Sequence, residues 1–428
     1  MTLPFRNIRD VLGLHAKVSP HKNSVISYDA QLQRKDMTYL EFVGKSHQVA
    51  NFLFEDLDIK RGDTIAIASP NHENSLLLYF ASWVIGASVV SVVLSDATET
   101  VKHILDDNRV KVLFVYHEHM DDFAPFVQAV GSLDGLVQIG GDRQENYLHF
   151  KDLASNRPTT FLGDESGAKG ADIPMTGGNE QTARLSDIAL ITYENGQKIQ
   201  LTQGDLLKNA TRLAQATALT GNQNALAILP FHQNFVESIL TPLVSGATII
   251  LAETFTADLF WQLVVGEHCH TTVLNTTELA LLVESAHQNM ASGGMRFGGK
   301  VIQQDIKHFR HVFTADSSLI SQIARDFEAT FGLPLITGYR HPQTQALLTI
   351  LPITLAWFQH QEVLHGNDRP SVGCDITSDS ITIISKNGEE LSEGKIGELA
   401  IKIDDVWQGI GQDGYFVNNE GNKFFYLA

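Results

Sequence analysis

The first third of the chain alternates short runs of β-branched residues with apolar helical segments, and this alternation restricts the fold more than any other feature. Buried strands are predicted at residues 63–69, 87–94 and 111–116, and helices at residues 75–85 and 98–107. Gly86 marks the end of the first helix. Strands separated by helices of this length usually pair in parallel, with helices on both faces of the sheet. The sequence therefore predicts an α/β fold with mainly parallel sheets.

A further helix is predicted at residues 39–53, where apolar side chains recur at helical spacing. Thr38 lies at its start, and Glu41 follows three residues later. This spacing is the capping-box pattern, in which two side chains satisfy the free N–H groups of the first helical turn.

The alternation resumes after a glycine-rich stretch at residues 155–186, which is predicted to be a surface linker. Further strands are predicted at residues 188–193, 225–229, 247–251, 272–275, 311–314 and 335–337, and helices at 202–217, 234–245, 256–267, 277–285 and 319–331. After Pro352 only short strands remain, at residues 372–374, 380–385, 398–403 and 424–427, with a turn at Asn387-Gly388. We therefore expect α/β subdomains over residues 1–186 and 187–352 and a small mostly-β subdomain over residues 353–428.

The charge balance argues against broad nucleic-acid or membrane surfaces. The chain has 31 Lys and Arg residues against 49 Asp and Glu residues, a net charge of −18 that repels phosphates and anionic lipids. Its two cysteines, Cys269 and Cys374, form no disulfide framework and fit a reducing compartment. No apolar stretch is long enough to span a membrane. A cytoplasmic location is expected, with no nucleic-acid partner and no membrane span.

Eight short segments, in order along nearly the whole chain, carry a family resemblance. They are Met37-Thr-Tyr, Ile59-Lys-Arg-Gly-Asp-Thr-Ile-Ala-Ile-Ala-Ser-Pro-Asn, Ile85-Gly-Ala-Ser-Val-Val-Ser-Val, Leu229-Pro-Phe-His, Leu243-Val-Ser-Gly-Ala-Thr-Ile-Ile-Leu, Phe331-Gly-Leu-Pro-Leu-Ile-Thr-Gly-Tyr, Glu393-Gly-Lys-Ile-Gly-Glu-Leu and Asp413-Gly-Tyr-Phe. This order resembles the adenylate-forming superfamily, which includes acyl-CoA synthetases, nonribosomal-peptide adenylation domains and luciferases.

The resemblance implies a fold and a reaction. The fold is two α/β subdomains in a five-layered αβαβα arrangement plus a small β-barrel-like subdomain. The reaction joins ATP to a carboxylic acid, such as a fatty or aryl acid, and passes the acyl group to the thiol of CoA or of a carrier protein, with Mg²⁺ at the phosphates. Because the sequence ends at Ala428, the C-terminal lid domain of the family, with its adenylation lysine, is expected to be absent.

The family's phosphate loop reads approximately Tyr-Thr-Ser-Gly-Thr-Thr-Gly-x-Pro-Lys-Gly, and the corresponding segment here is Ile191-Thr-Tyr-Glu-Asn-Gly-Gln-Lys-Ile-Gln-Leu-Thr. Thr192, Gly196 and Lys198 are the matching positions, and Lys198 is the residue that would contact an anion. Glu194 adds a negative charge, and a like-charge contact at about 4 Å costs on the order of 1–4 kcal/mol. The alternative interpretation is a two-residue turn at Asn195-Gly196 that joins two strands.

The family's adenine and magnesium motif, Gly-Tyr-Gly-x-Thr-Glu, appears here as Gly338-Tyr-Arg-His-Pro-Gln-Thr-Gln, and the preceding small-residue turn appears as Ala315-Asp-Ser-Ser. By resemblance, Tyr339 would stack on adenine and Thr344 would meet the α-phosphate. Gln343 or Gln345 replaces the magnesium-binding glutamate, and a neutral amide binds a hard dication poorly.

Two further residues match family positions. Glu420, within Tyr415-Phe-Val-Asn-Asn-Glu-Gly, corresponds to the ribose-binding aspartate or else belongs to a polar hairpin turn. His232 corresponds to the aromatic-gate or acyl-pocket histidine or else is a packed loop residue.

No metal site is predicted. His268-Cys269-His270 has no third and fourth ligand nearby in the sequence. His360 and His365 are likewise not predicted to bind a metal. No Gly-x-Ser-x-Gly elbow and no Gly-x-x-x-x-Gly-Lys-Ser/Thr loop is present.

Three functional hypotheses follow. The first is a non-adenylating pseudoenzyme or an acyl- or thioester-binding subunit of a biosynthetic pathway, acting with a partner protein. The second is a divergent ligase that adenylates a small carboxylic acid, with a separate chain supplying the lid domain. The third is a fold reused for other chemistry on an acyl thioester. A homodimer is expected on general grounds only.

Overall fold

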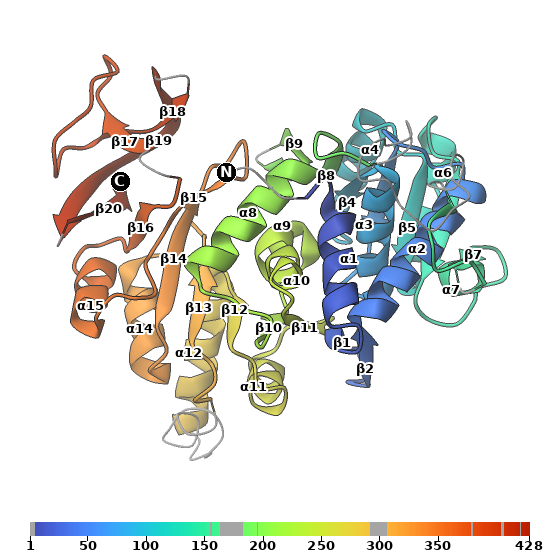
Figure 1. The fold of residues 1–428 in the computed structure, drawn as a ribbon, viewed down its shortest axis with the longest axis horizontal. Helices are drawn as coiled ribbons and strands as arrows, with labels where there is room; N and C mark the ends of the chain where they lie inside the picture. The colour runs from blue at the N-terminus through green and yellow to red at the C-terminus, as the bar shows by residue number, and fades with distance from the viewer. Residues whose placement is uncertain are drawn as a thin grey trace. The chain divides into compact units, whose positions relative to one another are not determined.

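The computed structural model describes residues 5–154, 156–162, 183–194, 196–291, 306–377, 380–403, 406–419 and 421–428. The chain forms two compact units (Figure 1). The first unit comprises Met1–Ala210 and Ile228–Thr254, and the second comprises Thr211–Ala227 and Phe255–Ala428. Most of the linker predicted at residues 155–186 lies outside the described residues.

The first unit contains a seven-stranded sheet with the strand order β7-β6-β5-β3-β4-β8-β9. Its strands are β3 (Thr64–Ala68), β4 (Ser88–Ser91), β5 (Val112–Tyr116), β6 (Gly135–Ile139), β7 (Leu148–His149), β8 (Ile188–Glu194) and β9 (Gln197–Thr202). All neighbours pair in parallel except β8 and β9, which are antiparallel. The parallel α/β fold predicted from the alternating pattern is therefore confirmed.

The first unit also contains three strands of a second sheet. β1 (Asn23–Tyr28) pairs in parallel with β11 (Thr248–Ala252) and antiparallel with β2 (Arg34–Thr38). The β1–β11 pairing places Val25 opposite Ile249, so residues that are far apart in the sequence share one hydrophobic layer.

Helices connect these strands. They are α1 (Ile8–Val18), α2 (Tyr39–Glu55), α3 (Glu73–Ile85), α4 (Thr98–Asp107), the 3-10 turn η1 (His117–His119), α5 (Met120–Phe123), α6 (Phe126–Ala129), α7 (Phe150–Ala154) and α8 (Gln203–Ala216), whose last residues belong to the second unit. The capping box at the start of α2 is confirmed: the Thr38 side chain accepts the Glu41 N–H, and the Glu41 carboxylate accepts the Thr38 N–H. Gly86 ends α3 with φ of +88°.

The single helix predicted over residues 234–245 is resolved into three parts. α9 (Phe231–Phe235) leads into a π-helical segment, η3 (Val236–Leu240), and then into α10 (Thr241–Val244). Asn234 has non-helical angles, with φ of −139° and ψ of 41°. π-helical segments are rare and often accompany functional sites.

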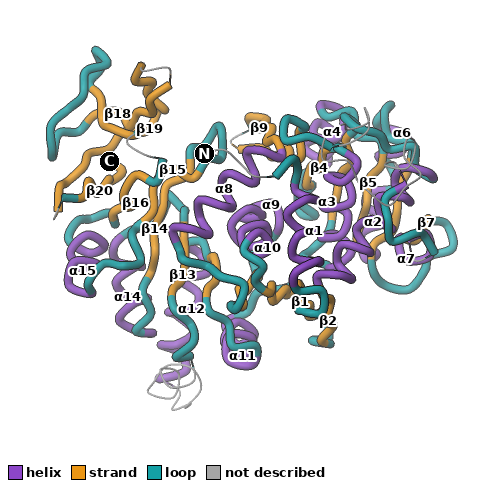
Figure 2. Tube along the Cα trace, in the orientation of Figure 1, coloured by secondary structure: helices purple, strands orange, loops and turns teal. Residues whose placement is uncertain are grey.

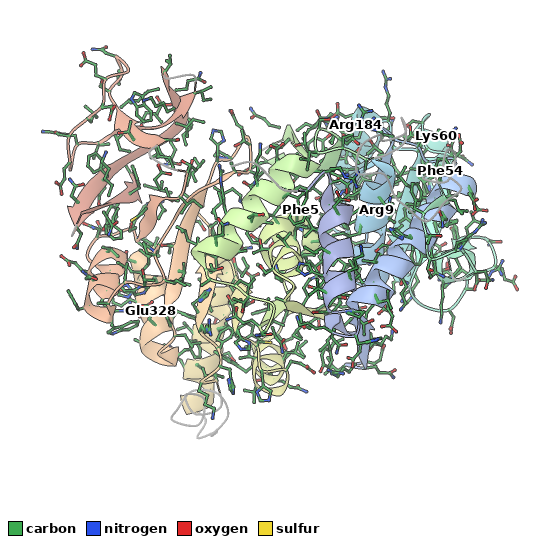
Figure 3. The ribbon with its side chains drawn as sticks, viewed as in Figure 1. Phe5, Arg9, Phe54, Lys60, Arg184 and Glu328 are labelled. Atoms are coloured by element: carbon green, nitrogen blue, oxygen red, sulfur yellow. The ribbon has the colours of Figure 1, made fainter. Side chains whose placement is uncertain are left out.

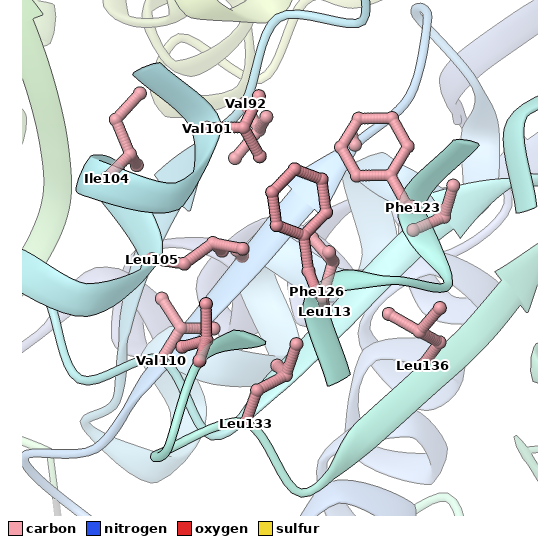
Figure 4. Close-up of a cluster of buried hydrophobic side chains, with 14 of the residues drawn as sticks. Val92, Val101, Ile104, Leu105, Val110, Leu113, Phe123, Phe126, Leu133 and Leu136 are labelled. Carbon is pink, nitrogen blue, oxygen red and sulfur yellow. The ribbon is translucent and has the colours of Figure 1, made fainter. Parts of the chain in front are cut away.

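One hydrophobic core cluster of the first unit lies where α4 and the short helices α5 and α6 cover the seven-stranded sheet (Figure 4). Leu105, Val110 and Leu113 are fully buried in it, and Phe123 and Phe126 pack beside them. Non-polar burial of this kind provides most of the free energy that favours folding.

The second unit has a mixed sheet with the order β10-β12-β13-β14-β15-β16-β20-β19-β18-β17. Its strands are β10 (Asn224–Ala227), β12 (Thr271–Val273), β13 (His311–Thr314), β14 (Leu335–Arg340), β15 (Leu347–Ile350), β16 (Ser371–Asp375), β17 (Ile381–Ile384), β18 (Gly397–Ile403), β19 (Val406–Asn419) and β20 (Asn422–Leu427). The first four pair in parallel and the others antiparallel. The four strands predicted after Pro352 are confirmed as β16, β17, β18 and β20, whereas β19 was not predicted; in the described residues the order is open rather than closed into a barrel.

The helices of the second unit are α11 (Ala257–Gly266), α12 (Thr276–Ala291), α14 (Ser321–Phe331) and α15 (Trp357–His365) (Figure 2). α14 packs against both α12 and α15. Within the described residues, no helix of either unit has the length and apolar character needed to cross a lipid bilayer.

Replacement of Leu105 by alanine tests the core of the first unit. Because Leu105 is fully buried, the substitution leaves a cavity and should lower the free energy of unfolding by about 2–5 kcal/mol, measured by urea denaturation. Leu148→Ala is the matched control: Leu148 is 49% exposed, so the change should stay within about 0.5 kcal/mol. Equal losses in the two variants would contradict this description of the core.

Candidate functional site

The segment that matches the family's phosphate loop is a tight hairpin between β8 and β9. Glu194 lies opposite Gln197, which leaves two residues for the turn. The second of them, Gly196, has φ of +76°, a left-handed conformation that glycine adopts without strain. Asn195 lies outside the described residues. Thr192 is paired opposite Ile199 in the same ladder.

Lys198 is held by the end of α4. Its Nζ donates to the Asp107 backbone oxygen at 3.1 Å and lies 3.2 Å from Asp107 Oδ2. Tyr193 Oη donates to the same carboxylate at 2.6 Å and accepts from Asn108 Nδ2 at 2.8 Å. The hydrogen bond from Tyr193, together with Lys198, lowers the pKa of Asp107.

Lys198 therefore faces the edge of the sheet where the parallel strands begin. Together with Arg61 and Arg109, it lines an open cavity of about 620 Å³ that also includes the first residues of β3, β4 and β8. Ligands of parallel α/β sheets bind at the opposite edge, where the strands end. The Lys198 ammonium is turned away from that edge.

In the second unit, Tyr339 and Thr344 belong to the hairpin between β14 and β15. Tyr339 is only 3% exposed and packs in a hydrophobic cluster with Leu348 and Phe425. Thr344 is exposed in the turn, and its N–H donates to His341 Nδ1 at 3.2 Å. The ring of Tyr339 is thus part of the core and has no free face for a purine.

The space beside this motif is very small. Thr314, Asp316, Gly338 and Arg369 line a cavity of about 10 Å³. This volume holds at most about one water molecule, whereas ligand pockets typically measure about 300–1,000 Å³. A Cβ on Gly338 would lie 2.9 Å from the Thr349 backbone oxygen, so the two hairpin strands are in close contact here.

The residues around this cavity do not fit a magnesium ion. The carboxylate of Asp316 accepts from the N–H groups of Thr276 and Ser318, both at 2.9 Å, and so serves the local turn. Gln345, one of the two candidates for the family's glutamate position, donates its side-chain amide to the Pro342 backbone oxygen at 2.8 Å.

His232 lies in the first unit, at the start of α9. Asn71 fixes this loop by donating to the Leu229 backbone oxygen at 2.7 Å and accepting from the Phe231 N–H at 3.0 Å. Burial lowers the pKa of His232, so the ring is neutral at pH 7. Phe231, which precedes His232 in the chain, forms an aromatic cluster with Phe235 and Tyr79.

The predicted site residues belong to both units. Thr192, Gly196 and Lys198 lie together in the hairpin of β8 and β9, and His232 lies elsewhere in the first unit. Tyr339 and Thr344 share the hairpin of the second unit. Glu420 lies outside the described residues.

A buried carboxylate that the sequence interpretation missed lies where strands of the first unit end. Glu253 directly follows β11, Tyr116 ends β5, and His72 follows β3. Glu253 accepts hydrogen bonds from Tyr116 and from the Ala30 N–H, and its Oε1 lies 3.8 Å from His72 Nε2. Polar residues at the ends of neighbouring predicted strands were the signal that could have revealed this cluster.

Burial, followed by repulsion from Asp29, raises the pKa of Glu253 to about 7. Burial lowers the pKa of His72 to about 4, and His72 Nδ1 accepts the Asn74 N–H at 3.1 Å. Nε2 therefore carries the proton of the neutral ring and faces Glu253. A carboxyl group that titrates near pH 7 can take up or release a proton under physiological conditions.

Comparison with protein families matches residues 14–410 to the AMP-binding enzyme family. The chain belongs to this family, and its resemblance to the adenylate-forming superfamily is confirmed. The family is one of acyl-CoA ligase-like proteins that use ATP, CoA and Mg²⁺.

Individual relatives are distant CoA ligases. The chain is 25% identical to sulfoacetate–CoA ligase of Cupriavidus necator over 52% of this chain and 40% of that protein. It is 21% identical to indoleacetate–CoA ligase of Aromatoleum aromaticum over 93% of this chain and 70% of that protein. The match to sulfoacetate–CoA ligase thus spans less than half of that protein's length.

Solved structures share the fold. A long-chain-fatty-acid–CoA ligase of Archaeoglobus fulgidus has a TM-score of 0.79 at 16% identity, over 100% of this chain and 84% of that chain. An anthranilate–CoA ligase in complex with anthranoyl-AMP has a TM-score of 0.77 at 17% identity, over 99% of this chain and 78% of that chain.

Replacement of Glu253 by glutamine tests the buried carboxylate. The pKa of Glu253 is raised in the folded protein. Its contribution to the free energy of unfolding is therefore fully present below the unfolded pKa of about 4.5 and is lost as the pH rises through about 7. The variant has no such charge to bury, so it should gain about 1–2 kcal/mol relative to wild type at pH 9, after allowance for solvent screening. Thermal unfolding from pH 5 to pH 9 measures this. Glu145→Gln, at an exposed carboxylate, is the control, and parallel pH profiles for Glu253→Gln and wild type would contradict the assignment.

Proposed function

We propose that this protein binds a small carboxylic acid or its acyl thioester and does not by itself form an acyl-adenylate. The observation that carries the proposal is the β8–β9 hairpin, whose Lys198 is bound to Asp107. A separate protein of the same pathway would supply or consume the bound acyl compound. A cytoplasmic location and a homodimer are part of the proposal.

The hairpin argues against a triphosphate site for a physical reason. A phosphate cradle needs several backbone N–H groups that converge on one point, which glycine-rich loops provide. In the hairpin the two strands pair up to Glu194 and Gln197, so the backbone groups between them serve the sheet. Glu194 also places a carboxylate next to the turn, where the phosphates would lie.

The second unit adds a further argument. Tyr339 is packed in the core, and the cavity beside Gly338 measures about 10 Å³. Tyr339 and Asp316 are thus engaged in other contacts, which supports the proposal because positioning and neutralisation of a magnesium nucleotide are the main source of catalysis in phosphoryl and adenylyl transfer.

The acid-binding part of the proposal rests on the first unit and on the relatives. By their names, relatives act on sulfoacetate, malonate, oxalate and indoleacetate. His232 is neutral and partly buried, and it directly follows Phe231 of an aromatic cluster, a setting that suits contact with an acyl group. Asn71 holds this loop in place, so the position of His232 does not depend on the β8–β9 hairpin.

The second candidate is a divergent carboxylic acid ligase that a separate chain completes. It is favoured by the alignment with indoleacetate–CoA ligase over 93% of this chain. In that case the β8–β9 hairpin would have to open when ATP binds, and Lys198 would have to leave Asp107.

Thermal unfolding and pyrophosphate release separate these two functions. We expect magnesium-ATP to leave the melting temperature unchanged and no pyrophosphate to form with sulfoacetate, malonate, oxalate or indoleacetate. One of these acids or its CoA thioester should raise the melting temperature by several degrees without ATP, because a ligand that binds only the folded state stabilises it.

Variants make this test specific. His232→Gln should abolish the stabilisation by the acid or thioester, whereas His21→Gln, at an exposed histidine of the first unit, should preserve it. Stabilisation by magnesium-ATP, or acid-dependent pyrophosphate release, would refute the proposed function and support the ligase.

A further inference from the structure

A second cavity lies entirely within the second unit, at the edge of its sheet where the parallel strands begin. Its volume is about 230 Å³. His311 is the first residue of β13, and Pro334 directly precedes β14. The small cavity described above is lined by Thr314, the last residue of β13, and by Gly338, near the end of β14. The larger cavity is thus separate from the candidate nucleotide region.

The volume is sufficient for a small ring. An engineered apolar cavity of about 150 Å³ admits benzene, so this cavity has room for a ring with one substituent. Much of its wall is apolar, with Ile336, Pro352 and Leu355 among the lining residues. The indole of Trp357 forms another part of the wall and stacks on His360, with ring centroids 5.4 Å apart and an interplanar angle of 10°.

The orientation of His360 is fixed by Glu328 on α14, the residue labelled in Figure 3. Glu328 Oε1 accepts from His360 Nε2 at 2.6 Å and from the Leu335 N–H at 2.8 Å. Glu328 Oε2 accepts from Gln361 Nε2 at 2.6 Å and from His365 Nε2 at 2.7 Å. Burial alone would raise the pKa of Glu328, but the hydrogen bonds from the two histidines outweigh it and hold the pKa at about 2.

This network determines which nitrogen of His360 can meet a ligand. Nε2 donates to Glu328, so the ring is held like the histidine of a carboxylate–histidine pair. Nδ1 makes no hydrogen bond within the described part of the chain. On the neutral ring Nδ1 carries no proton, so it can only accept a hydrogen bond from a molecule in the cavity.

Two further polar residues, His311 and Arg310, line the cavity. His311 is 6% exposed, and its Nε2 is buried without a hydrogen-bond partner in the described structure. A buried polar group without a partner costs about 1–3 kcal/mol, so its presence requires an explanation. Arg310 lies exposed beside His311 and makes no ion pair with any described residue.

We propose that this cavity is a binding site for a small aromatic monocarboxylate. The ring fits between Trp357 and the aliphatic wall, where aromatic contacts are favourable. The carboxylate pairs with the guanidinium of Arg310, whose planar fork matches it. A single negative charge is specified because Arg310 is the one cation among the residues that line the cavity in the described structure.

The proposal does not depend on the proposed function, since no residue of the β8–β9 hairpin or of the His232 loop takes part. It assigns roles to Trp357 and Arg310, which the family motifs do not include. The site would allow a small acid to bind at the second unit independently of the chemistry at the first.

The test uses the full chain, in which every tryptophan is replaced by 5-fluorotryptophan. Benzoate is the probe ligand. The chain has four tryptophans, Trp83, Trp261, Trp357 and Trp407, and each gives a separate fluorine resonance. Benzoate should shift the resonance of Trp357, identified by its loss in Trp357→Phe, in a saturable manner. Trp261, buried in the second unit, and Trp83, in the first unit, should not shift.

Charge variants identify the partner of the carboxylate. Arg310→Gln removes an exposed side chain and should weaken benzoate binding about tenfold or more. Lys307→Gln, an exposed cation three residues away that does not line the cavity, should bind as wild type does. Neutral benzamide should bind at least about tenfold more weakly than benzoate.

Several results would overturn the proposal: no saturable shift of Trp357, a shift of Trp83 without Trp357, equal binding of benzamide and benzoate, or wild-type affinity in Arg310→Gln. Because Arg310 is exposed, its replacement does not threaten folding, and an unchanged melting temperature of the variant confirms that a loss of binding is specific.

Discussion

Backbone pairing between β8 and β9 is the constraint that limits what this segment of the protein can bind. A backbone N–H that is hydrogen-bonded within the β-ladder is unavailable for a ligand. The ladder here continues to Glu194 and Gln197, the two residues that flank the turn. The pair between Lys198 and Asp107 ties the same hairpin to the end of α4. The ion pair alone is weak, since an exposed ion pair contributes about 0–1 kcal/mol. Together with the backbone pairing, it gives the hairpin a fixed structural role.

Local patterns in the sequence predicted much of the fold, and non-local pairing accounts for what they missed. α4 was placed at its observed bounds and α2 with its cap, because amphipathic spacing and capping residues act within a few positions. The parallel pairing of β1 with β11 was not predictable in this way. The same limit applies to the sites: the hairpin turn could be read from the sequence, whereas Glu328 on α14 receives its hydrogen bonds from α15 and from the start of β14.

The buried glutamates show how surroundings determine the chemistry of one side-chain type. Glu328 receives four hydrogen bonds and remains charged far below neutral pH. Glu253 receives fewer donors, faces the charge of Asp29, and titrates near pH 7. Burial disfavours the charged form of both, and the number of donors decides the outcome. A fixed anion suits the orientation of His360, while a carboxyl group that changes its charge suits a site that exchanges protons.

The short turn at Gly196 has a consequence for the history and the engineering of this fold. Because β8 and β9 remain in register up to the turn, a longer connection can be inserted there without shifting either strand, and the entropy cost of lengthening a loop grows only slowly. The hairpin is therefore a junction at which a nucleotide-binding loop can be lost or regained while the sheet stays intact. Relatives with and without that loop can share one scaffold.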